Sequence, residues 1–281
     1  MASIVEQMTA VYVFVDDFLK AHPGQTQWRL SNHHAPAFSD AEVITIGLMQ
    51  SCLGTGTLKN AYQFVAENLR DAFPLLPNYQ QWLARLHSLT GVIGQLLQAA
   101  GCQAPLDDAH FYLLDSMPIR MCKPVRHGRV RLLCQDGAYW GKNSTGWFFG
   151  FKLHVLVHHS GVILAAVLTP ANWPDQDVAL ALAWSVRGGL ALADLGYRAE
   201  ELAQALMEEA DLVLLTPASV AKNTPQRALI SSIRERVETT FSGLWERMVD
   251  RCRSRSWEGL WCTLKLKMLH YNLGLAGLLP A

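Results

Sequence analysis

Two β-rich runs separated by a two-residue turn constrain the fold more than any other feature of the sequence. The runs WFFGFKLHVLVHH (147–159) and VILAAVLTP (162–170) flank Ser160 and Gly161, a dipeptide typical of a β-hairpin turn. The shorter apolar run FYLLD (111–115) precedes them and has the length of a further strand. The chain is therefore expected to contain a sheet that includes an antiparallel hairpin.

The segment after the hairpin alternates between helix and strand. A helix is predicted from Pro174 to about Ser185, with Asp175 and Asp177 in its first turn, where the helix dipole favours carboxylates. The patterns that follow predict a strand, a helix, a strand and a long helix, at 189–197, 199–209, 211–217 and 226–249. The predicted order β-β-β-α-β-α-β-α gives an α/β fold, a mixed sheet with helices packed on it.

The first hundred residues are predicted to be helical. One helix opens with Ser39 followed three residues later by Glu42, which is a capping box, and it runs from 39 to 54. Further amphipathic segments predict helices at 58–70 and 78–100.

The helices at 39–54 and 58–70 are joined by the short turn GTGT, an outline typical of a helix-turn-helix motif. In such a motif the side chains facing DNA would be Lys59, Asn60, Gln63 and Arg70. Plain packing in a helical bundle is the alternative interpretation. The acidic balance of this part of the chain favours the bundle.

Half of the 281 residues are hydrophobic, so the chain can bury a sizeable core. The segment GCQAPLDD (101–108) is a plausible linker between an N-terminal helical domain at 1–105 and a second domain at 106–281. The apolar stretches are interrupted before the roughly 20 residues of a membrane helix, which predicts no membrane association. Six cysteines without a CxxC pair, and no signal-like N-terminus, fit reduced thiols in a cytoplasm.

The net charge is zero, but basic and acidic blocks alternate along the chain. Residues 116–160 carry 7 Lys or Arg against 1 Asp or Glu, and residues 222–281 carry 10 against 5. The two remaining blocks are acidic. If the basic blocks converge in space, they form a surface for a polyanion; solvated charge scattered over a neutral surface is the alternative.

Two predicted strands end in an aspartate. Asp115 follows FYLL and precedes Pro118, and Asp194 follows LALA and precedes Gly196. Open sheets bind their ligands at the carboxyl ends of strands, so both carboxylates are candidate site residues. A role in capping a turn or a helix is the alternative for either one alone.

The third candidate carboxylate is Glu238, on the long helix. It lies next to the predicted buried stripe, and Arg234 stands four residues before it on the same face. A surface ion pair between these two residues, worth about 0.3–0.5 kcal/mol, is the alternative interpretation. Three ionised carboxylates gathered together need a cation, and oxygen ligands select Mg²⁺ or Mn²⁺. Two such ions are the usual device for in-line displacement at phosphorus.

The three blocks LLDSMPIRMC, LADLGYR and RERVETTFSGL, in this order, resemble the DDE transposases of bacterial insertion sequences, most closely the insertion-sequence family numbered 982. The segments FGFKLH, TPAN followed by Asp177, and FSDAEVITI add to the resemblance, which covers about 39–275.

This resemblance implies an RNase-H-like catalytic core and a metal-binding triad of Asp115, Asp194 and Glu238 that holds two Mg²⁺ or Mn²⁺ ions. It also implies that the protein nicks DNA at terminal inverted repeats and joins the freed 3′-OH to target DNA. The expected partners are DNA and a second copy of the chain, in a bacterial cytoplasm. Related transposases often carry a Tyr and a Lys around the glutamate, where this chain has Ser231 and Trp245, so phosphate contacts are not carried over to those positions.

Several side chains are candidate DNA contacts. Lys152 and His154 alternate with apolar residues and are expected to point to one face beside Asp115. Basic residues in the segment after Asp115 suit phosphates, and an exposed tryptophan suits stacking on an unpaired base. The other members of the predicted DNA-binding set are Arg126, Lys142, Trp173, Arg234 and Arg236.

Two other functions remain open on the sequence alone. An RNase-H-like nuclease or resolvase would share the metal triad and cut without joining, and a non-catalytic DNA-binding relic would keep only the fold. An aspartyl phosphatase is excluded, because position 117, where its second aspartate belongs, is methionine.

Overall fold

The computed structural model describes residues 3–25, 36–53, 56–104, 106, 110–143, 146–197, 199–217, 224–247 and 254–279. Inside these ranges the side chains at 124, 127, 128, 225–234 and 236 are also outside the description. The chain divides into two compact units. The first comprises Met1–Ala104 with Arg247–Ala281, and the second Pro105–Glu246.

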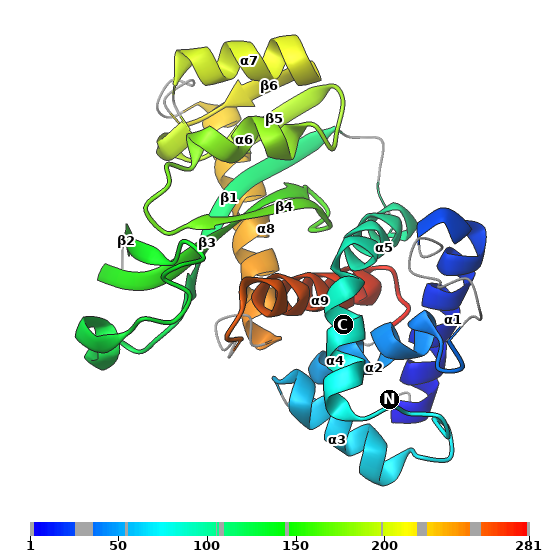
Figure 1. The fold of residues 1–281 in the computed structure, drawn as a ribbon. Coiled ribbons are helices and arrows are strands. Elements are labelled where there is room, and N and C mark those ends of the chain that lie inside the picture. The colour runs from blue at the N-terminus through cyan, green and yellow to red at the C-terminus, as the bar shows by residue number, and fades with distance from the viewer. Residues whose placement is uncertain are drawn as a thin grey trace. The chain divides into compact units, whose positions relative to one another are not determined.

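The first unit is built from helices (Figure 1). The helices are α1 Ile4–Ala21, η1 Pro23–Gln25, α2 Asp40–Cys52, α3 Leu58–Asn68, α4 Tyr79–Ser88, α5 Thr90–Gln103 and α9 Trp257–Leu275. The predicted capping box is confirmed, since Ser39 Oγ accepts from Glu42 N and Glu42 Oε2 accepts from Ser39 N. Helix α2 is buried along most of its length, and the indole of Trp82 from α4 donates to its Val43 carbonyl.

The single helix predicted at 78–100 is wrong, because the segment forms α4 and α5 with a break at Leu89. The hydroxyl of Ser88 donates to the Arg85 carbonyl, and that of Thr90 donates to the His87 carbonyl. Such local side-chain bonds compete with the helical ladder and favour a break. Leu89 is buried at the junction, which ties the break to the core.

Helix α9 belongs to the helical unit, whereas the sequence assigned residues 106–281 to one domain. It packs against α5, α2 and α4, and its leucines are buried almost all round the helix. A helix that is apolar on every side must be surrounded by other elements, which explains its place here. Its buried Lys267 donates to the Arg247 carbonyl.

The second unit contains a six-stranded mixed sheet (Figure 1). The strands are β1 Phe111–Arg120, β2 Tyr139–Asn143, β3 Gly146–His158, β4 Ile163–Pro170, β5 Gly189–Ala193 and β6 Leu212–Leu215. They run in the order β2-β3-β1-β5-β6, and β4 follows β2 along the same edge of β3. β3 pairs antiparallel with β1, β2 and β4, whereas β5 pairs parallel with β1 and β6. The mixed sheet and its hairpin are therefore confirmed.

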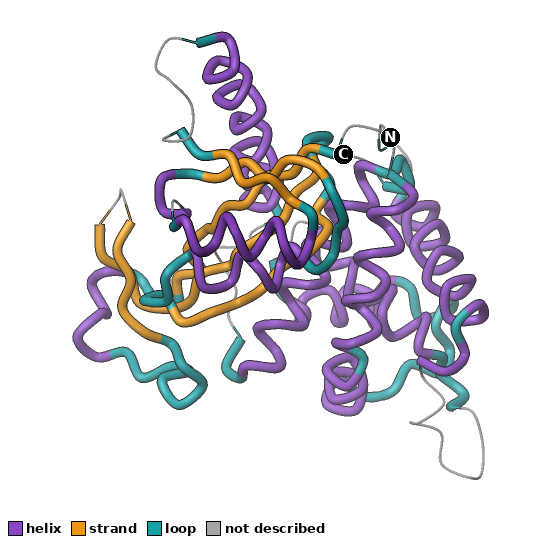
Figure 2. The backbone as a smooth tube through the Cα atoms, turned by 90° about the horizontal axis from the view of Figure 1, so that it is seen from above, coloured by secondary structure: helices purple, strands orange, loops and turns teal. Residues whose placement is uncertain are grey.

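Helices lie on both faces of this sheet (Figure 2). On one face α6 Gln176–Ala183 and α7 Glu200–Ala210 cover a core that includes Leu114 and Leu156. On the other face α8 Pro225–Glu246 packs against β1 and β5. In the described part of the chain, none of the helices has the length and apolar content needed to span a bilayer.

Strand β1 does not end at Asp115, as the sequence predicted, but continues through Pro118 to Arg120. Met121 N donates to Phe149 O on the β3 side, so by alternation the nitrogen of Pro118 points away from β3. In the described part of the chain, that edge of β1 has no strand partner after Leu114, where the pairing with β5 ends. Proline is tolerated at such an open edge because no ladder hydrogen bond is lost there.

Two other boundaries differ from expectation. β2 was not predicted, because its sequence YWGKN contains weak strand formers. α6 begins at Gln176 rather than at Pro174, and Asp175 at its N-cap makes no side-chain capping bond. A short 3₁₀ helix, η3 Pro124–Arg129, lies between β1 and β2.

Substituting Gly189 tests the packing at the start of the β1–β5 pair. A Cβ atom at Gly189 would overlap the carbonyl oxygen of His110, which accepts from Leu190 N. Gly146 has nearly the same φ, +116° against +115°, and open space around it, so Gly146→Ala is the matched control. Gly146→Ala should cost about 1 kcal/mol of unfolding free energy, and Gly189→Ala at least roughly 3 kcal/mol, in urea denaturation. Equal losses would contradict the close approach.

Candidate active site

The parallel pairing of β1 with β5 brings two predicted site residues side by side. Its register pairs Leu113 with Leu192 and Leu114 with Ala193, so the next positions along the two chains are Asp115 and Asp194. Neighbouring strands lie about 4.8 Å apart, so these carboxylates come from adjacent backbone positions. Because side chains alternate along a strand, Asp115 points to the face opposite Leu114. Helix α8 covers that face, where Asp115 lies.

Each aspartate is oriented partly by a nearby backbone amide. Asp115 Oδ1 accepts from Ser116 N at 2.7 Å, and Asp194 Oδ1 accepts from Gly196 N at 2.7 Å. Both side chains are half-buried. Asp194 follows β5 directly and enters the short 3₁₀ helix η4 Leu195–Tyr197.

A third carboxylate, Asp175, lies near them, although the sequence predicted only a helix-turn role for it. Its Oδ1 accepts from Lys152 Nζ at 2.9 Å and from Ser116 Oγ at 3.3 Å. A Cβ atom built on Gly196 would lie 3.0 Å from Asp194 Oδ1 and 3.9 Å from Asp175 Oδ2. The two carboxylates therefore flank Gly196. No local sequence signal pointed to this role, because it depends on strand pairing between distant segments.

His154 is completely buried beside Asp175. Its Nε2 is 2.8 Å from Thr169 Oγ1, and its Nδ1, which has no hydrogen-bond partner, is 3.6 Å from Asp175 Oδ1. Burial lowers the pKa of His154 to about 4; Asp175 opposes this shift and Lys152 adds to it. The ring is therefore neutral at pH 7.

Tyr197 is a second buried group without a hydrogen-bond partner. Its side chain is fully buried, and its hydroxyl has no partner among the described residues. Burial raises the pKa of this phenol well above its usual value, and Asp175, Asp115 and Asp194 raise it further, in that order. All three carboxylates thus act on one buried hydroxyl.

Glu238 is exposed on α8, next to the buried face of that helix. Val237 and Leu244 are buried there, and buried Thr240 donates to the Gly161 carbonyl. Among the residues that the structure describes, no three His, Cys, Asp or Glu side chains lie close enough together to hold a metal ion. The structure therefore brings Asp115 and Asp194 together and does not gather Glu238 with them.

The prediction that Lys152 and His154 lie on the same face of the sheet as Asp115 is wrong. The antiparallel register pairs Ser116 with His154 and Pro118 with Lys152, so both lie on the face opposite Asp115. Lys152 is tied to Asp175 and to the Trp173 carbonyl, and His154 has no exposed surface. Their side chains therefore contact Asp175 rather than lying beside Asp115.

Other predicted DNA contacts are exposed. Lys142 on β2 lies over the ring of Trp147 on β3, 5.8 Å from its centroid, and 62% of the Trp147 surface is exposed. Trp173 is 46% exposed in the loop before α6, and Arg126 is exposed on η3. The side chains of Arg234 and Arg236 lie outside the described residues.

Comparison with known proteins assigns the family. A family model described as a transposase DDE domain matches residues 107–255, just over half of the chain. The chain belongs to this family. Neither the curated proteins nor the solved structures contain a match. Asp115, Asp194, Asp175 and Glu238 all lie inside the matched region of this transposase.

Transposase DDE domains generally use divalent metal ions, and the donors in this site fit them. Asp115 and Asp194 offer carboxylate oxygens from adjacent backbone positions, and hard oxygen ligands suit Mg²⁺ and Mn²⁺. The nearby histidine is buried against Thr169, so the set is one of oxygen donors.

The buried His154 predicts a pH dependence of stability. Its folded-state pKa lies below the ordinary value of 6.5, so the unfolded chain binds more protons between about pH 6.5 and 4. The contribution of neutral His154 to the free energy of unfolding is complete above pH 6.5. As the pH falls toward 4 this contribution is lost, and the free energy of unfolding decreases by on the order of 3 kcal/mol. Urea denaturation across this range should give a shallower pH dependence for His154→Gln than for wild type. Identical slopes would mean that burial does not suppress protonation of the ring.

Proposed function

We propose that this transposase cleaves DNA at the terminal inverted repeats of a mobile element and joins the freed 3′-OH to target DNA, using two Mg²⁺ or Mn²⁺ ions. The observation that carries the proposal is the register of β1 and β5, which puts Asp115 beside Asp194 in a chain of the transposase DDE family. Membership of the insertion-sequence family numbered 982 is the finer assignment, supported by the blocks around these residues.

We infer an RNase-H-like core for residues 105–246. Three features support it: antiparallel strands followed by parallel crossovers, a central β1 between β3 and β5, and helices on both faces. Asp115 lies on the central strand β1, and Asp194 directly follows β5, its parallel neighbour.

In the proposed mechanism Asp115, Asp194 and Glu238 would hold the metal. The bound ions would activate the attacking oxygen and stabilise the leaving oxygen at phosphorus. Backbone amides of Ser116 and Gly196 orient the two aspartates. Exposed Glu238 lies on the helix that packs on β1 and β5 and would be the third ligand of the metal. Water is the first nucleophile and the DNA 3′-OH the second.

DNA contacts in the catalytic unit are proposed for the β2–β3 hairpin and for η3. Lys142 suits a phosphate, and the exposed ring of Trp147 beside it suits stacking on an unpaired base. Arg126, Arg129 and Arg131 are exposed along η3 and the turn after it, where they suit the DNA backbone. Trp173 remains a proposed stacking residue.

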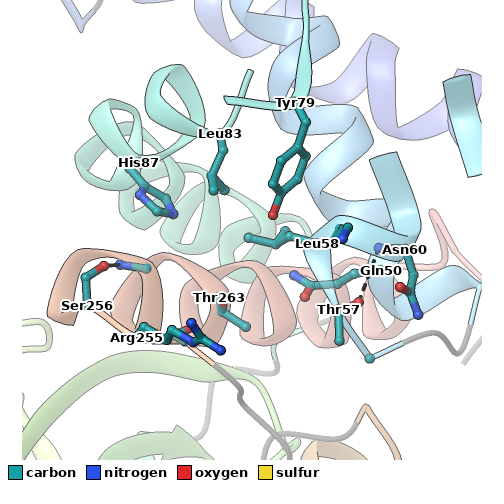
Figure 3. A pocket seen from close by; sticks show the side chains of 14 residues that line it. Gln50, Thr57, Leu58, Asn60, Tyr79, Leu83, His87, Arg255, Ser256 and Thr263 are labelled. Carbon is teal, nitrogen blue, oxygen red and sulfur yellow. Dashed lines mark hydrogen bonds between the residues drawn. The ribbon is translucent and has the colours of Figure 1, made fainter. Parts of the chain in front are cut away.

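The helical unit is proposed to bind the DNA end. A hollow of about 710 Å³ lies among α3, α4 and α9, and Figure 3 shows Tyr79, Leu83 and His87 on one side of it with Arg255, Ser256 and Thr263 on the other. Its lining includes Lys59 and Arg255, and none of the described lining residues is a carboxylate.

The charge of this hollow suits a phosphate. The N-termini of α3 and α9 both contribute to the lining, and helix N-termini carry partial positive charge.

Since each chain would bind one terminal repeat and two ends must be synapsed, a homodimer is expected in the active complex.

The carboxylates provide the first test. Asp115→Asn, Asp194→Asn or Glu238→Gln should each lower metal-dependent cleavage of terminal-repeat DNA by at least about 10³-fold, because each removes a metal ligand. Glu235→Gln changes an exposed glutamate on the same helix and should retain cleavage. DNA binding, measured by gel shift in Ca²⁺, should persist in all four variants.

Full cleavage activity in any one of the three variants would remove that residue from the triad. Cleavage without strand transfer in the wild type would instead identify a nuclease or resolvase. Binding without cleavage would identify a non-catalytic relic.

The hollow in the helical unit provides a second test. Lys59→Gln and Arg255→Gln should each weaken binding of terminal-repeat DNA and reduce the slope of log K against log salt by about 1, because each removes a phosphate contact. Lys20→Gln is the control, since this substitution removes the same charge from α1, where Lys20 pairs with Asp16. Salt slopes equal to wild type in both variants would remove the hollow from the DNA interface.

A further inference from the structure

We propose that Asp175 is a fourth carboxylate of the catalytic centre and binds a divalent cation together with Asp194. The inference rests on the proposed metal-dependent function and adds to it a ligand that neither the sequence nor the family match assigns. Asp175 stands in the loop that leads into α6, between Asp115 and Asp194 in the sequence.

The contacts of Asp175 are divided unevenly between its two oxygens. Lys152 and Ser116 donate to Oδ1, and His154 Nδ1 lies 3.6 Å from the same atom. Among the described residues, Oδ2 has no hydrogen-bond partner, and it is the oxygen that lies 3.9 Å from the Cβ position of Gly196, on which Asp194 Oδ1 also borders. The Oδ1 contacts thus fix the orientation of the carboxylate, and Oδ2 remains available to a ligand, as in metal sites whose ligands are held by surrounding hydrogen bonds.

The local charge is also unbalanced. Asp175 Oδ2 and Asp194 Oδ1 both lie beside Gly196. Within the described residues, Lys152 is the cation paired with Asp175. These two carboxylates against one ammonium leave an excess of one negative charge, which a divalent cation would neutralise.

Two buried polar atoms, which have no hydrogen-bond partner among the described residues, point to a ligand in the same place. His154 Nδ1 lies 3.6 Å from Asp175 Oδ1, and the Tyr197 hydroxyl is buried on η4, which follows Asp194 directly. A buried polar group without a partner is costly, so such groups are expected to be satisfied when a site is occupied. Water molecules bound to the cation would give both atoms partners.

The test measures Mn²⁺ binding to the full chain by electron paramagnetic resonance, without DNA and without activity. Asp175→Asn should weaken Mn²⁺ binding at least 10-fold. Asp177→Asn is the matched control, because Asp177 is exposed two residues further on and loses the same charge, and it should bind Mn²⁺ like wild type. Asp115→Asn is measured beside them as the reference for the proposed centre.

A purely structural role for Asp175 is separated by thermal unfolding with and without Mn²⁺. The proposal expects the Mn²⁺-induced rise in the unfolding midpoint to shrink in Asp175→Asn; a lowered midpoint with an undiminished rise overturns it. If Asp175→Asn does not fold, Asp175→Glu keeps the charge, displaces the carboxylate and should bind Mn²⁺ more weakly than Asp177→Glu. Equal binding by those two variants overturns the proposal.

The outcomes also separate this proposal from the function on which it rests. Weakened binding in Asp115→Asn with wild-type binding in Asp175→Asn overturns the role of Asp175 alone. Wild-type binding in both variants overturns the proposed metal centre as well.

Discussion

The parallel pairing of β1 with β5 is the constraint on which the site depends. Because Leu114 pairs with Ala193, the next residue on each chain is an aspartate, and the two carboxylates come from neighbouring backbone positions. A slip of one residue would turn one carboxylate to the opposite face of the sheet. The close approach of Gly189 to the His110 carbonyl lies at the other end of this pairing. The register thus links the packing of the sheet to its chemistry.

Concentrating negative charge at these strand ends destabilises the fold unless other groups oppose it. Lys152 on β3 opposes this charge with its ammonium group, and Ser116 on β1 donates a hydrogen bond to Asp175. Asp175 thus ties two strands to the start of α6. The neighbouring apolar core beneath α6 and α7 supplies the burial that supports this polar cluster. The same burial keeps His154 neutral. The site is therefore held by the sheet and its helices rather than by loops alone.

The features that the sequence predicted correctly are those set by local chemistry. The capping box of Ser39 with Glu42 and the hairpin turn at Ser160 and Gly161 each depend on residues close in the chain. The place of α9 was missed because it depends on tertiary packing. Asp175 was missed for the same reason, since its partners lie 23 and 59 residues away. Alternation placed Lys152 and His154 on one face correctly, but only the strand register could show that Asp115 is on the other.

The most direct measurement is an anomalous-scattering map from crystals of the full chain bound to terminal-repeat DNA and Mn²⁺. The account predicts manganese density in contact with both Asp115 and Asp194, with Glu238 of α8 brought into the same site. Density that avoids both aspartates would contradict the central claim that the β1–β5 register builds the catalytic metal centre.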